Sequence, residues 1–481
     1  MKESLYKKLE NYSNSDYYPF HMPGHKRNMG GREMEEAFHI DITEIDGFDN
    51  LHHAEGILRD AMKSASELYH SEETHFLVNG STCGILSAIS ATVKKHGKIL
   101  LARNCHKAAY HAIYLRELEP VYLYPPVQDE YGIFNAVPVE KIEDVLEKNP
   151  DIEAVFLTSP TYDGVVSDVA SIVRTAHRKK IPVIVDEAHG AHFGFHKDFP
   201  ENSVALGADM VIHSVHKTLP AFTQTALLHI NGDLVDRKKI NYFLQVYQTS
   251  SPSYLLMAGI DQCISILQQE RDSLFEKLSG YMDEFLEKCR TLRNIKIFQQ
   301  GDADYEFDKS KILLSVKDCP MTGHELAQIL LNRYHLQMEM EAPTYVMGIA
   351  TIMDTQEGFR RLAEALTEID RELEHRQKNP RGQSEQKQNE NDKMFYDLGE
   401  AKKIYHLYEI DDMEKETIPL EKSVNRVSVE YIYLYPPGIP IVAPGELMTE
   451  HILELINAYK KAHYAVQGPE DYKMEKLSVI K

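Results

Sequence analysis

Between residues 75 and 235 the chain repeats one pattern, a short apolar run followed by a helix-like stretch. Helix-like segments such as Ser81–Lys95 and Ser167–Lys180 separate the runs. Several runs are continuously apolar, which is typical of strands covered on both faces. The alternation predicts an α/β fold with a largely parallel sheet. The predicted strands are Lys98–Ala102, Val121–Tyr124, Ala154–Thr158, Pro182–Asp186, Met210–Ser214 and Ala226–Ile230.

The sequence on either side of this region predicts further parts. A helical pattern runs from about Ser253 to Leu292, and the later apolar runs KILLSV and YVMGIAT predict a second, smaller α/β unit. A polar, apolar-poor stretch then predicts a solvated segment. The expected parts are 1–70 as an N-terminal arm and helix, 71–295 as the large domain, 296–370 as the first part of the small domain, 371–393 as a linker or exposed loop, and 394–481 as a C-terminal domain.

Charge and cysteine usage limit the possible functions. The 481 residues carry a net charge of −21, which argues against nucleic acid and anionic membranes as partners. A cationic small-molecule substrate is compatible with it. The five cysteines form no CxxC pair, which favours a reduced compartment. The N-terminus lacks a signal-peptide core, and no apolar run is long enough to span a membrane, so we expect a cytoplasmic protein.

The first candidate site is the segment Asn79-Gly80-Ser81-Thr82, which precedes an amphipathic helix. Such a start offers backbone N–H groups and two hydroxyls at the positive end of a helix dipole, so it could bind a phosphate. The alternative is that Ser81 or Thr82 only caps the helix.

The second candidate is Asp186, at the end of the apolar run in IPVIVDEAHGAH. Ligands of open α/β sheets bind outside the carboxyl ends of the strands. A carboxylate at this position is therefore a candidate binding group. The alternative is a turn or helix-cap aspartate.

The third candidate is Lys217, which closely follows another apolar run in MVIHSVHKTLPAFTQ. A buried lysine is unfavourable without a partner, and desolvation lowers the pKa of an ammonium group. A lysine of lowered pKa is what Schiff-base chemistry needs. The alternative is a surface lysine whose stem lies along apolar neighbours.

Together these features are the parts of a pyridoxal-phosphate (PLP) site. Lys217 would hold the cofactor aldehyde, and Asp186 would pair with the pyridine nitrogen. Ser81, Thr82 and Ser214 would hold the phosphate. His106, just after the run Lys98–Ala102, is a candidate to cover the ring.

Several motifs resemble the ornithine/lysine/arginine decarboxylases, which are PLP enzymes of fold type I, the aspartate-aminotransferase-like fold. They are PFHMPGHK at 19–26, RNCHK at 103–107, PTYDG at 160–164, DEAHGAH at 186–192, SVHKTLPAFTQ at 214–224 and YPPGIPIVAPGE at 435–446. The likeness runs from about residue 15 to 465, in family order. Within this family, the sequence resembles the short, Bacillus-type branch that includes a biosynthetic arginine decarboxylase. Because this branch lacks an N-terminal wing domain, we expect no decamer.

The resemblance implies a role for each matching residue. Lys217 is the cofactor lysine, Asp186 contacts the ring nitrogen and His106 stacks on the ring. The other residues expected around the phosphate or the lysine are Gly80, Ser81, Thr82, His189, Ser214 and His216. Hydroxyls within Thr249-Ser250-Ser251 would reach a neighbouring subunit, so the resemblance implies a homodimer or a dimer of dimers.

The implied reaction is decarboxylation of a basic amino acid, with arginine ranked before lysine and ornithine, in polyamine metabolism. Lys217, His216 or another local acid would return the proton to Cα. A carboxylate would recognise the basic end of the substrate. Asp46, Asp49 and Glu446 are the candidates, and ordinary turn carboxylates are the alternative for the two aspartates.

Three other functions stay open from the sequence. His189, His192 and His196 in HGAHFGFH could suggest a metal-dependent hydrolase if His192 and His196 shared a helix face, but Gly190 and Gly194 disfavour a helix there. We expect no metal. Another fold type I PLP enzyme, an aminotransferase or a lyase, is possible because fold does not fix the reaction. A catalytically inactive paralogue is the third alternative, and the intact Asp186 and Lys217 argue against it.

Overall fold

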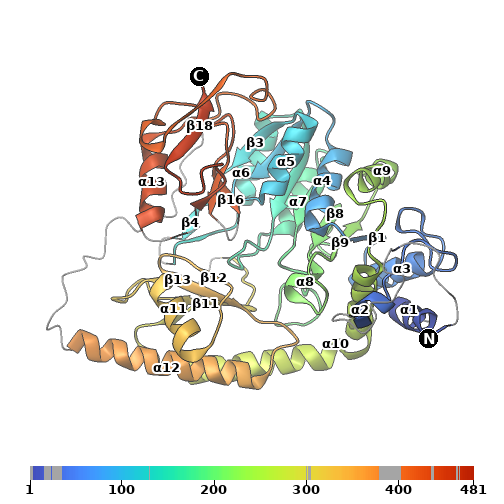
Figure 1. Cartoon of the computed structure of the whole chain (residues 1–481), viewed down its shortest axis with the longest axis horizontal. Coiled ribbons are helices and arrows are strands. Elements are labelled where there is room, and N and C mark those ends of the chain that lie inside the picture. Colours follow the sequence, from blue (N-terminus) through green and yellow to red (C-terminus); the bar gives the residue numbers. More distant parts are fainter. Residues whose placement is uncertain are drawn as a thin grey trace. The chain divides into compact units, whose positions relative to one another are not determined.

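The computed structural model describes residues 4–15, 23, 35–128, 131–299, 301, 305–378, 402–434, 438–461, 464 and 466–481. Within it the chain forms two compact units, each made of several segments (Figure 1). Unit 1 comprises 1–94, 149–159 and 169–276, and unit 2 comprises 95–148, 160–168 and 277–481. The consecutive domains expected from the sequence are a different division of the chain and stay a prediction.

Unit 1 is built on strands in the order β1-β9-β8-β7-β6. β6, β7 and β8 run parallel, whereas β9 is antiparallel to both β8 and β1. β7 and β8 are buried at every position, as their continuously apolar sequences predict. The strands are β1 (Glu73–Leu77), β6 (Ile152–Thr158), β7 (Val183–Asp186), β8 (Met210–His213) and β9 (Ala226–Ile230).

Helices cover this sheet. α4 packs against the strands and against α9, and α3 packs against β1. Gly84 of α4 allows close approach, since a Cβ there would lie 2.6 Å from Leu77 and 3.3 Å from Ile212. The helices that begin in unit 1 are α1 (Leu5–Ser13), α2 (Glu35–His39), η1 (Leu51–His53), α3 (Ile57–Tyr69), α4 (Gly80–Thr92), α7 (Val169–His177), α8 (Val215–Thr218), α9 (Arg237–Tyr247) and α10 (Tyr254–Cys289).

Unit 2 contains a parallel pair, a hairpin and a small antiparallel sheet. β2 (Lys98–Ala102) pairs with β3 (Glu119–Leu123), and β4 (Val127–Gln128) pairs with β5 (Ile133–Phe134). The small sheet has the order β10-β11-β13-β12, and α11 packs against β13 and α12. Its elements are β10 (Lys296–Ile297), β11 (Lys311–Ser315), α11 (Gly323–Tyr334), β12 (Met340–Glu341), β13 (Tyr345–Ile349) and α12 (Gln356–Lys378); α5 (Lys107–Arg116) and α6 (Val139–Lys148) also belong to the unit.

The C-terminal part of unit 2 has its own apolar core. Side chains of α13 such as Leu455 and Ile456 pack with Leu477 and Val479 of β18, and the two elements lie side by side in Figure 1. The elements are β14 (Lys415–Pro419), η4 (Leu420–Lys422), β15 (Ile432–Leu434), β16 (Ile439–Val442), α13 (Glu450–Lys461), β17 (Val466–Gln467) and β18 (Lys476–Ile480).

The predicted α/β architecture with a mainly parallel sheet and a C-terminal domain is confirmed. β1 was not predicted, because its sequence ETHFL mixes polar and apolar residues. α12 continues to Lys378, eight residues into the segment expected to be a linker, and the rest of that segment lies outside the described residues. The motif PFHMPGHK and the Pro-Pro pair at 436–437 lie almost wholly outside them too.

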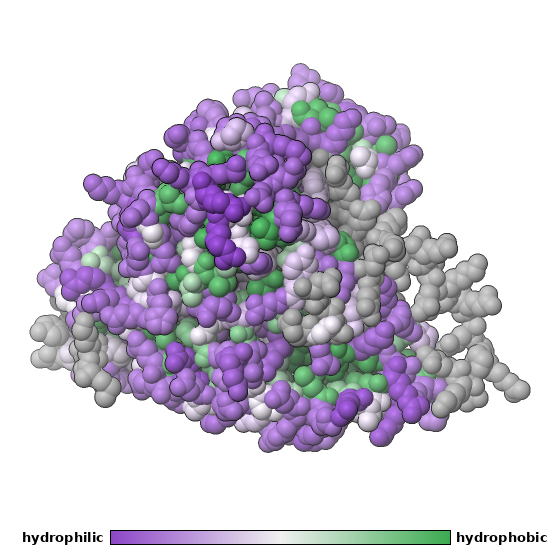
Figure 2. Space-filling model, turned by 180° about the vertical axis from the view of Figure 1, so that it is seen from behind, coloured by the Kyte–Doolittle hydropathy of each residue, from purple (hydrophilic) through white to green (hydrophobic). Residues whose placement is uncertain are grey.

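The surface and the cysteines agree with the composition. The face shown in Figure 2 is mostly hydrophilic, with apolar side chains in small separate patches. All five cysteines are buried, and none of them forms a disulfide. Among the described residues no helix has the length and apolar character needed to cross a bilayer.

Candidate active site

Two neighbouring parallel strands bring Asp186 and Lys217 to one edge of the sheet in unit 1. Asp186 is the last residue of β7 and pairs in register with Ile212 of β8. The chain leaves β8 at His213 and turns at once into the short helix α8, which carries Lys217. Asp186 is buried and Lys217 is half-buried. The two residues predicted from separate strand ends therefore share one edge, as ligand-binding groups of open α/β sheets do.

The amine of Lys217 has a defined partner. Its Nζ lies 3.0 Å from Nε2 of His189, which is buried in the turn that follows β7. An imidazole nitrogen at this distance can accept a proton from the amine or donate one to it. His189 was predicted as a cofactor contact, and the structure places it directly on the lysine.

The carboxyl of Asp186 lies in an environment that favours a cationic partner. Burial raises its pKa above the ordinary value, whereas the charge of Lys217 and an N–H from Ala188 at 3.2 Å act in the opposite direction. A buried carboxylate stays ionised only when nearby charge compensates for its desolvation. A protonated pyridine nitrogen would provide such a charge.

The start of α4 is tied to the lysine helix by a single loop. The carbonyl of Gln224 accepts the N–H of Gly80 at 2.9 Å, and the next carbonyl, that of Thr225, lies 2.8 Å from Nδ1 of His216. Gly80 has a φ of 73°, which suits glycine. These bonds connect the predicted phosphate segment to α8 within unit 1.

The residues predicted to bind the phosphate have polar groups that could still bind a ligand. The N-cap residue of α4, Asn79, makes no side-chain cap bond, and Ser81 and Thr82 follow it at half-buried and exposed positions. Ser214 is fully buried, and its hydroxyl has no hydrogen-bond partner within the part of the chain that the structure describes. Buried hydroxyls are normally paired, so an orphaned one fits a ligand oxygen such as that of a phosphate. The residues present therefore fit PLP.

The segment 249–251 lies beside this helix start in the same chain. The N–H of Thr249 donates to Oδ1 of Asn79 at 3.4 Å, and its carbonyl lies 2.8 Å from Nε2 of His52. Its expected role toward a neighbouring subunit stays a prediction.

His106 belongs to unit 2, where it caps α5. Its Nδ1 accepts the N–H of Ala108 at 3.2 Å, which fixes the ring at the end of the loop that leaves β2. The ring is half-buried, so part of it is accessible. Its predicted stacking on a cofactor stays a prediction.

Glu446 is also in unit 2, and it forms a buried ion pair that the sequence did not reveal. Its Oε2 accepts from Arg103 at 3.0 Å and from the N–H of Ala443 at 2.8 Å, and both charged side chains are 3% exposed. Burial raises the pKa of Glu446, and Arg103 opposes this rise. Arg103 directly follows β2, three residues before His106. The pair thus joins the C-terminal motif to the loop that holds His106.

The two aspartates predicted as substrate contacts lie in one loop of unit 1 and differ sharply. Asp49 accepts four backbone N–H groups, from Asn50, Glu55, Gly56 and Leu58, at 2.7–3.1 Å. Burial opposes its charge, but these bonds together hold the pKa of its carboxyl below the usual value. Asp46 is exposed. Asp49 therefore closes the loop before α3, as a turn carboxylate would, whereas Asp46 is accessible to a ligand.

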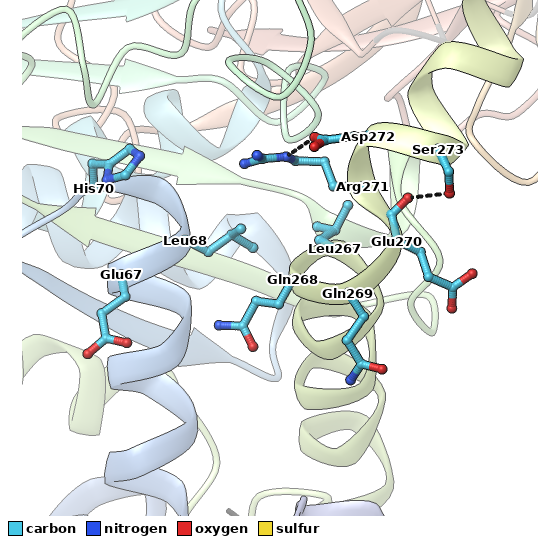
Figure 3. A pocket seen from close by; sticks show the side chains of 10 residues that line it. All are labelled: Glu67, Leu68, His70, Leu267, Gln268, Gln269, Glu270, Arg271, Asp272 and Ser273. Atoms are coloured by element: carbon cyan, nitrogen blue, oxygen red, sulfur yellow. Dashed lines mark hydrogen bonds and ion pairs between the residues drawn. The ribbon is translucent and has the colours of Figure 1, made fainter. Parts of the chain in front are cut away.

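A pocket on unit 1 does not involve the predicted residues. It lies between the end of α3 and the middle of α10, with Leu68 and Leu267 at its floor and Glu67, Gln269 and Glu270 pointing outward (Figure 3). Its arginine, Arg271, bonds to the adjacent Asp272 at 3.0 Å. It shares no lining residue with the Lys217 edge.

The local structure around His192 and His196 differs from the one that the metal-dependent hydrolase alternative required. His192 and His196 lie in a series of turns, whereas zinc binding by that pair required a helix. Within the described ranges no group of three or more histidine, cysteine, aspartate or glutamate side chains could hold a metal ion.

The fold is the one shared by the PLP enzymes of fold type I. The structure of a lysine decarboxylase from Francisella novicida superposes with a TM-score of 0.84 over 99% of this chain and 81% of that one, at 21% identity. A serine palmitoyltransferase from Sphingomonas wittichii gives a TM-score of 0.53 over 66% of this chain and 77% of that one, at 16% identity. The predicted fold class is confirmed.

The chain belongs to the Orn/Lys/Arg decarboxylase family. The model of the family's major domain matches residues 3–308, and that of its C-terminal domain matches residues 392–470. An arginine decarboxylase from Bacillus subtilis is 32% identical over 99% of this chain and 97% of its own length. The constitutive lysine decarboxylase of Escherichia coli is 24% identical over 92% of this chain and 75% of its own length. The predicted family and class of enzyme, an amino-acid decarboxylase, are confirmed.

Proposed function

We propose that this chain uses PLP to decarboxylate a basic amino acid to the corresponding amine, with arginine the first candidate substrate, lysine the second and ornithine the third. One observation carries the proposal: the amine of Lys217 is in hydrogen-bond contact with His189 at the strand edge that also buries Asp186. Family membership supports the reaction. The full-length similarity to an arginine decarboxylase supports the order of substrates.

PLP, when bound, would supply an acceptor for the electron pair that loss of carbon dioxide leaves at Cα. Lys217 would hold the cofactor aldehyde and Asp186 its ring nitrogen. Ser214 and the first amides of α4 would hold the phosphate, and His106 would cover the ring.

The hydrogen bonds of His216 bear on which group returns the proton to Cα. Burial lowers the pKa of His216, so its ring is neutral near pH 7. Its one proton is on Nδ1, which donates to the carbonyl of Thr225. The other nitrogen therefore has no proton to give. Lys217, which can exchange a proton with His189, is the better candidate.

The proposal includes a homodimer with active sites at the subunit interface, a cytoplasmic location and a role in polyamine metabolism. The family resemblance and the acidic, disulfide-free chain support these points. Of the three carboxylates proposed to read the substrate, Asp46 is the one whose exposure suits that role.

An amine assay tests the proposal. The full chain with PLP is given arginine, lysine or ornithine, and agmatine, cadaverine or putrescine is measured by mass spectrometry. Lys217→Ala is the inactive variant, and Lys179→Ala, at an exposed position of the same unit, is the matched control. We expect one amine from the wild type and the control, and none from Lys217→Ala. If PLP binds but no amine forms, the reaction is another one, with transamination tested next.

A further inference from the structure

A second group of ionisable side chains lies behind the strand ends that carry Asp186 and Lys217. Glu187 directly follows Asp186, His213 ends β8, and His229 lies on β9. Their exposed fractions are 1%, 0% and 0%. We call these three residues the buried row. Glu187 lies within the motif DEAHGAH, but neither the sequence analysis nor the proposed reaction gives any of the three residues a role.

Hydrogen bonds join the buried row from end to end. Nε2 of His213 lies 2.8 Å from Oε2 of Glu187, and its Nδ1 lies 3.1 Å from Nε2 of His229. Nδ1 of His229 lies 2.8 Å from the hydroxyl of Thr74 on β1. At the other end, Glu187 also accepts the N–H and the hydroxyl of Ser203. With Thr74, the row thus runs from the end of β7 across β8 and β9 to β1.

The buried row and Asp186 lie on opposite sides of the sheet end. Ile212 faces Gly84 of α4, and Asp186 is its in-register neighbour. Because side chains of a strand alternate, His213 points to the other face. There the ring of Tyr69, the last residue of α3, packs on His213 at 4.9 Å between centroids. Glu187 and Asp186 are therefore separated by one peptide and the thickness of the sheet.

The hydrogen bonds indicate where the charges of the row are. Burial, with help from the charge of His213, lowers the pKa of His229 well below its usual value, so that ring is neutral and has one donor and one acceptor nitrogen. If His229 donates to Thr74, His213 donates from both nitrogens and is an imidazolium that balances the carboxylate of Glu187. The other tautomer would leave the carboxylate of Glu187 buried without a countercharge, because its remaining hydrogen-bond partner, Ser203, is neutral, and this is unfavourable.

We propose that His213, held by His229, is a positioning residue that neutralises Glu187 so that Asp186 stays ionised toward the ring nitrogen of bound cofactor. This inference rests on the proposed function. The electrostatics agree in direction: burial is the main cause that raises the pKa of Asp186, the charge of Lys217 and the N–H of Ala188 lower it most, and Glu187 raises it and His213 lowers it by smaller amounts. Without His213, a second buried negative charge would drive a proton onto Asp186.

Three variants test the inference: His213→Gln, Glu187→Gln, and the double variant with both changes. Each glutamine keeps a hydrogen-bonding group but removes a charge. For each full-length protein, the dissociation constant of PLP and the pH titration of the bound cofactor's visible absorption are measured, with thermal unfolding of the PLP-free form as the folding control. These readouts do not depend on turnover.

We expect His213→Gln to weaken PLP binding about tenfold or more and to shift the absorption titration. Glu187→Gln and the double variant should bind PLP within about threefold of wild type, because both lack the uncompensated carboxylate. A purely structural role predicts that the double variant is at least as impaired as His213→Gln. That result, or equal binding by His213→Gln and wild type, would overturn the inference. A wild-type chain that binds no PLP would instead refute the proposed function.

Discussion

Each unit buries a carboxylate near the end of a strand, and the two carboxylates differ in their partners. Glu446 in unit 2 pairs with the guanidinium of Arg103, a cation that no chemistry of the site removes. Asp186 in unit 1 has an N–H from Ala188 and the charge of Lys217, an amine that must give up a proton before it can react with an aldehyde. The charge of Glu446 is thus balanced within the protein, and the contrast is why we propose that a bound ligand balances that of Asp186.

The largest effect on stability is expected for Glu446→Gln. The amide would leave Arg103 buried without a countercharge, and breaking a buried pair in this way destabilises a protein by about 3–5 kcal/mol. Chemical unfolding of the PLP-free chain measures the change. Glu454→Gln, at an exposed position of the same unit, is the matched control and should stay within about 0.5 kcal/mol of wild type.

Asp186→Asn should have the opposite profile. Burial raises the pKa of Asp186 above its ordinary value of 3.8. At a pH above 3.8, ionisation of this carboxyl therefore opposes folding, and the amide of Asn removes that penalty. The PLP-free variant should be at least as stable as wild type at pH 7. Its kcat/KM should fall on the order of 10²-fold, the scale of losing one electrostatic partner in an active site. A loss of stability like that of Glu446→Gln would erase the contrast between the two carboxylates.

Asp49→Asn should lower stability by about 1–2 kcal/mol at pH 7, because Asp49 gathers four N–H groups around the start of α3. The pKa of Asp49 is lower in the folded chain than its ordinary value of 3.8. The ionised carboxylate therefore stabilises the fold at a pH above 3.8, and this contribution is lost as the pH falls through the folded-state pKa. Unfolding curves of both proteins from pH 7 to pH 3 should converge at the acidic end. A constant difference across that range would refute the role of the charge.

Asp46→Asn should change stability least, by less than about 0.5 kcal/mol, because the side chain is exposed. This variant tests whether Asp46 is the residue that contacts the substrate. If Asp46 reads the basic end of the substrate, KM rises while kcat changes little. Steady-state kinetics with the substrate found in the amine assay measures both, and an unchanged KM would leave Asp46 a turn carboxylate.

The sequence predicted the elements whose signal is local. Continuous apolar runs predicted β2, β6, β7, β8 and β9, because burial on both faces favours apolar residues at most positions. The strand-end positions of Asp186 and Lys217 then placed both at one sheet edge. The antiparallel direction of β9 could not be predicted, since periodicity contains no information on which way a strand runs.

The rest depended on contacts between distant segments. Arg103 stood in a recognised motif, but its partner Glu446 is 343 residues away. The row of Glu187, His213 and His229 joins side chains of two strands and of the residue that follows a third, and no spacing in the sequence indicates that they touch. Asp49 remained a candidate substrate contact because no sequence motif indicates that the loop up to Leu58 folds back and donates its N–H groups to this carboxylate.

Reductive trapping shows directly whether Lys217 is the residue that binds PLP. The full chain is incubated with PLP, treated with borohydride, digested and mapped by mass spectrometry, with Lys179→Ala and Lys217→Ala as companion samples. The account predicts a phosphopyridoxyl adduct on the peptide that contains Lys217, and its absence from Lys217→Ala. An adduct that resides on another lysine, or a wild-type chain that traps none, would contradict it.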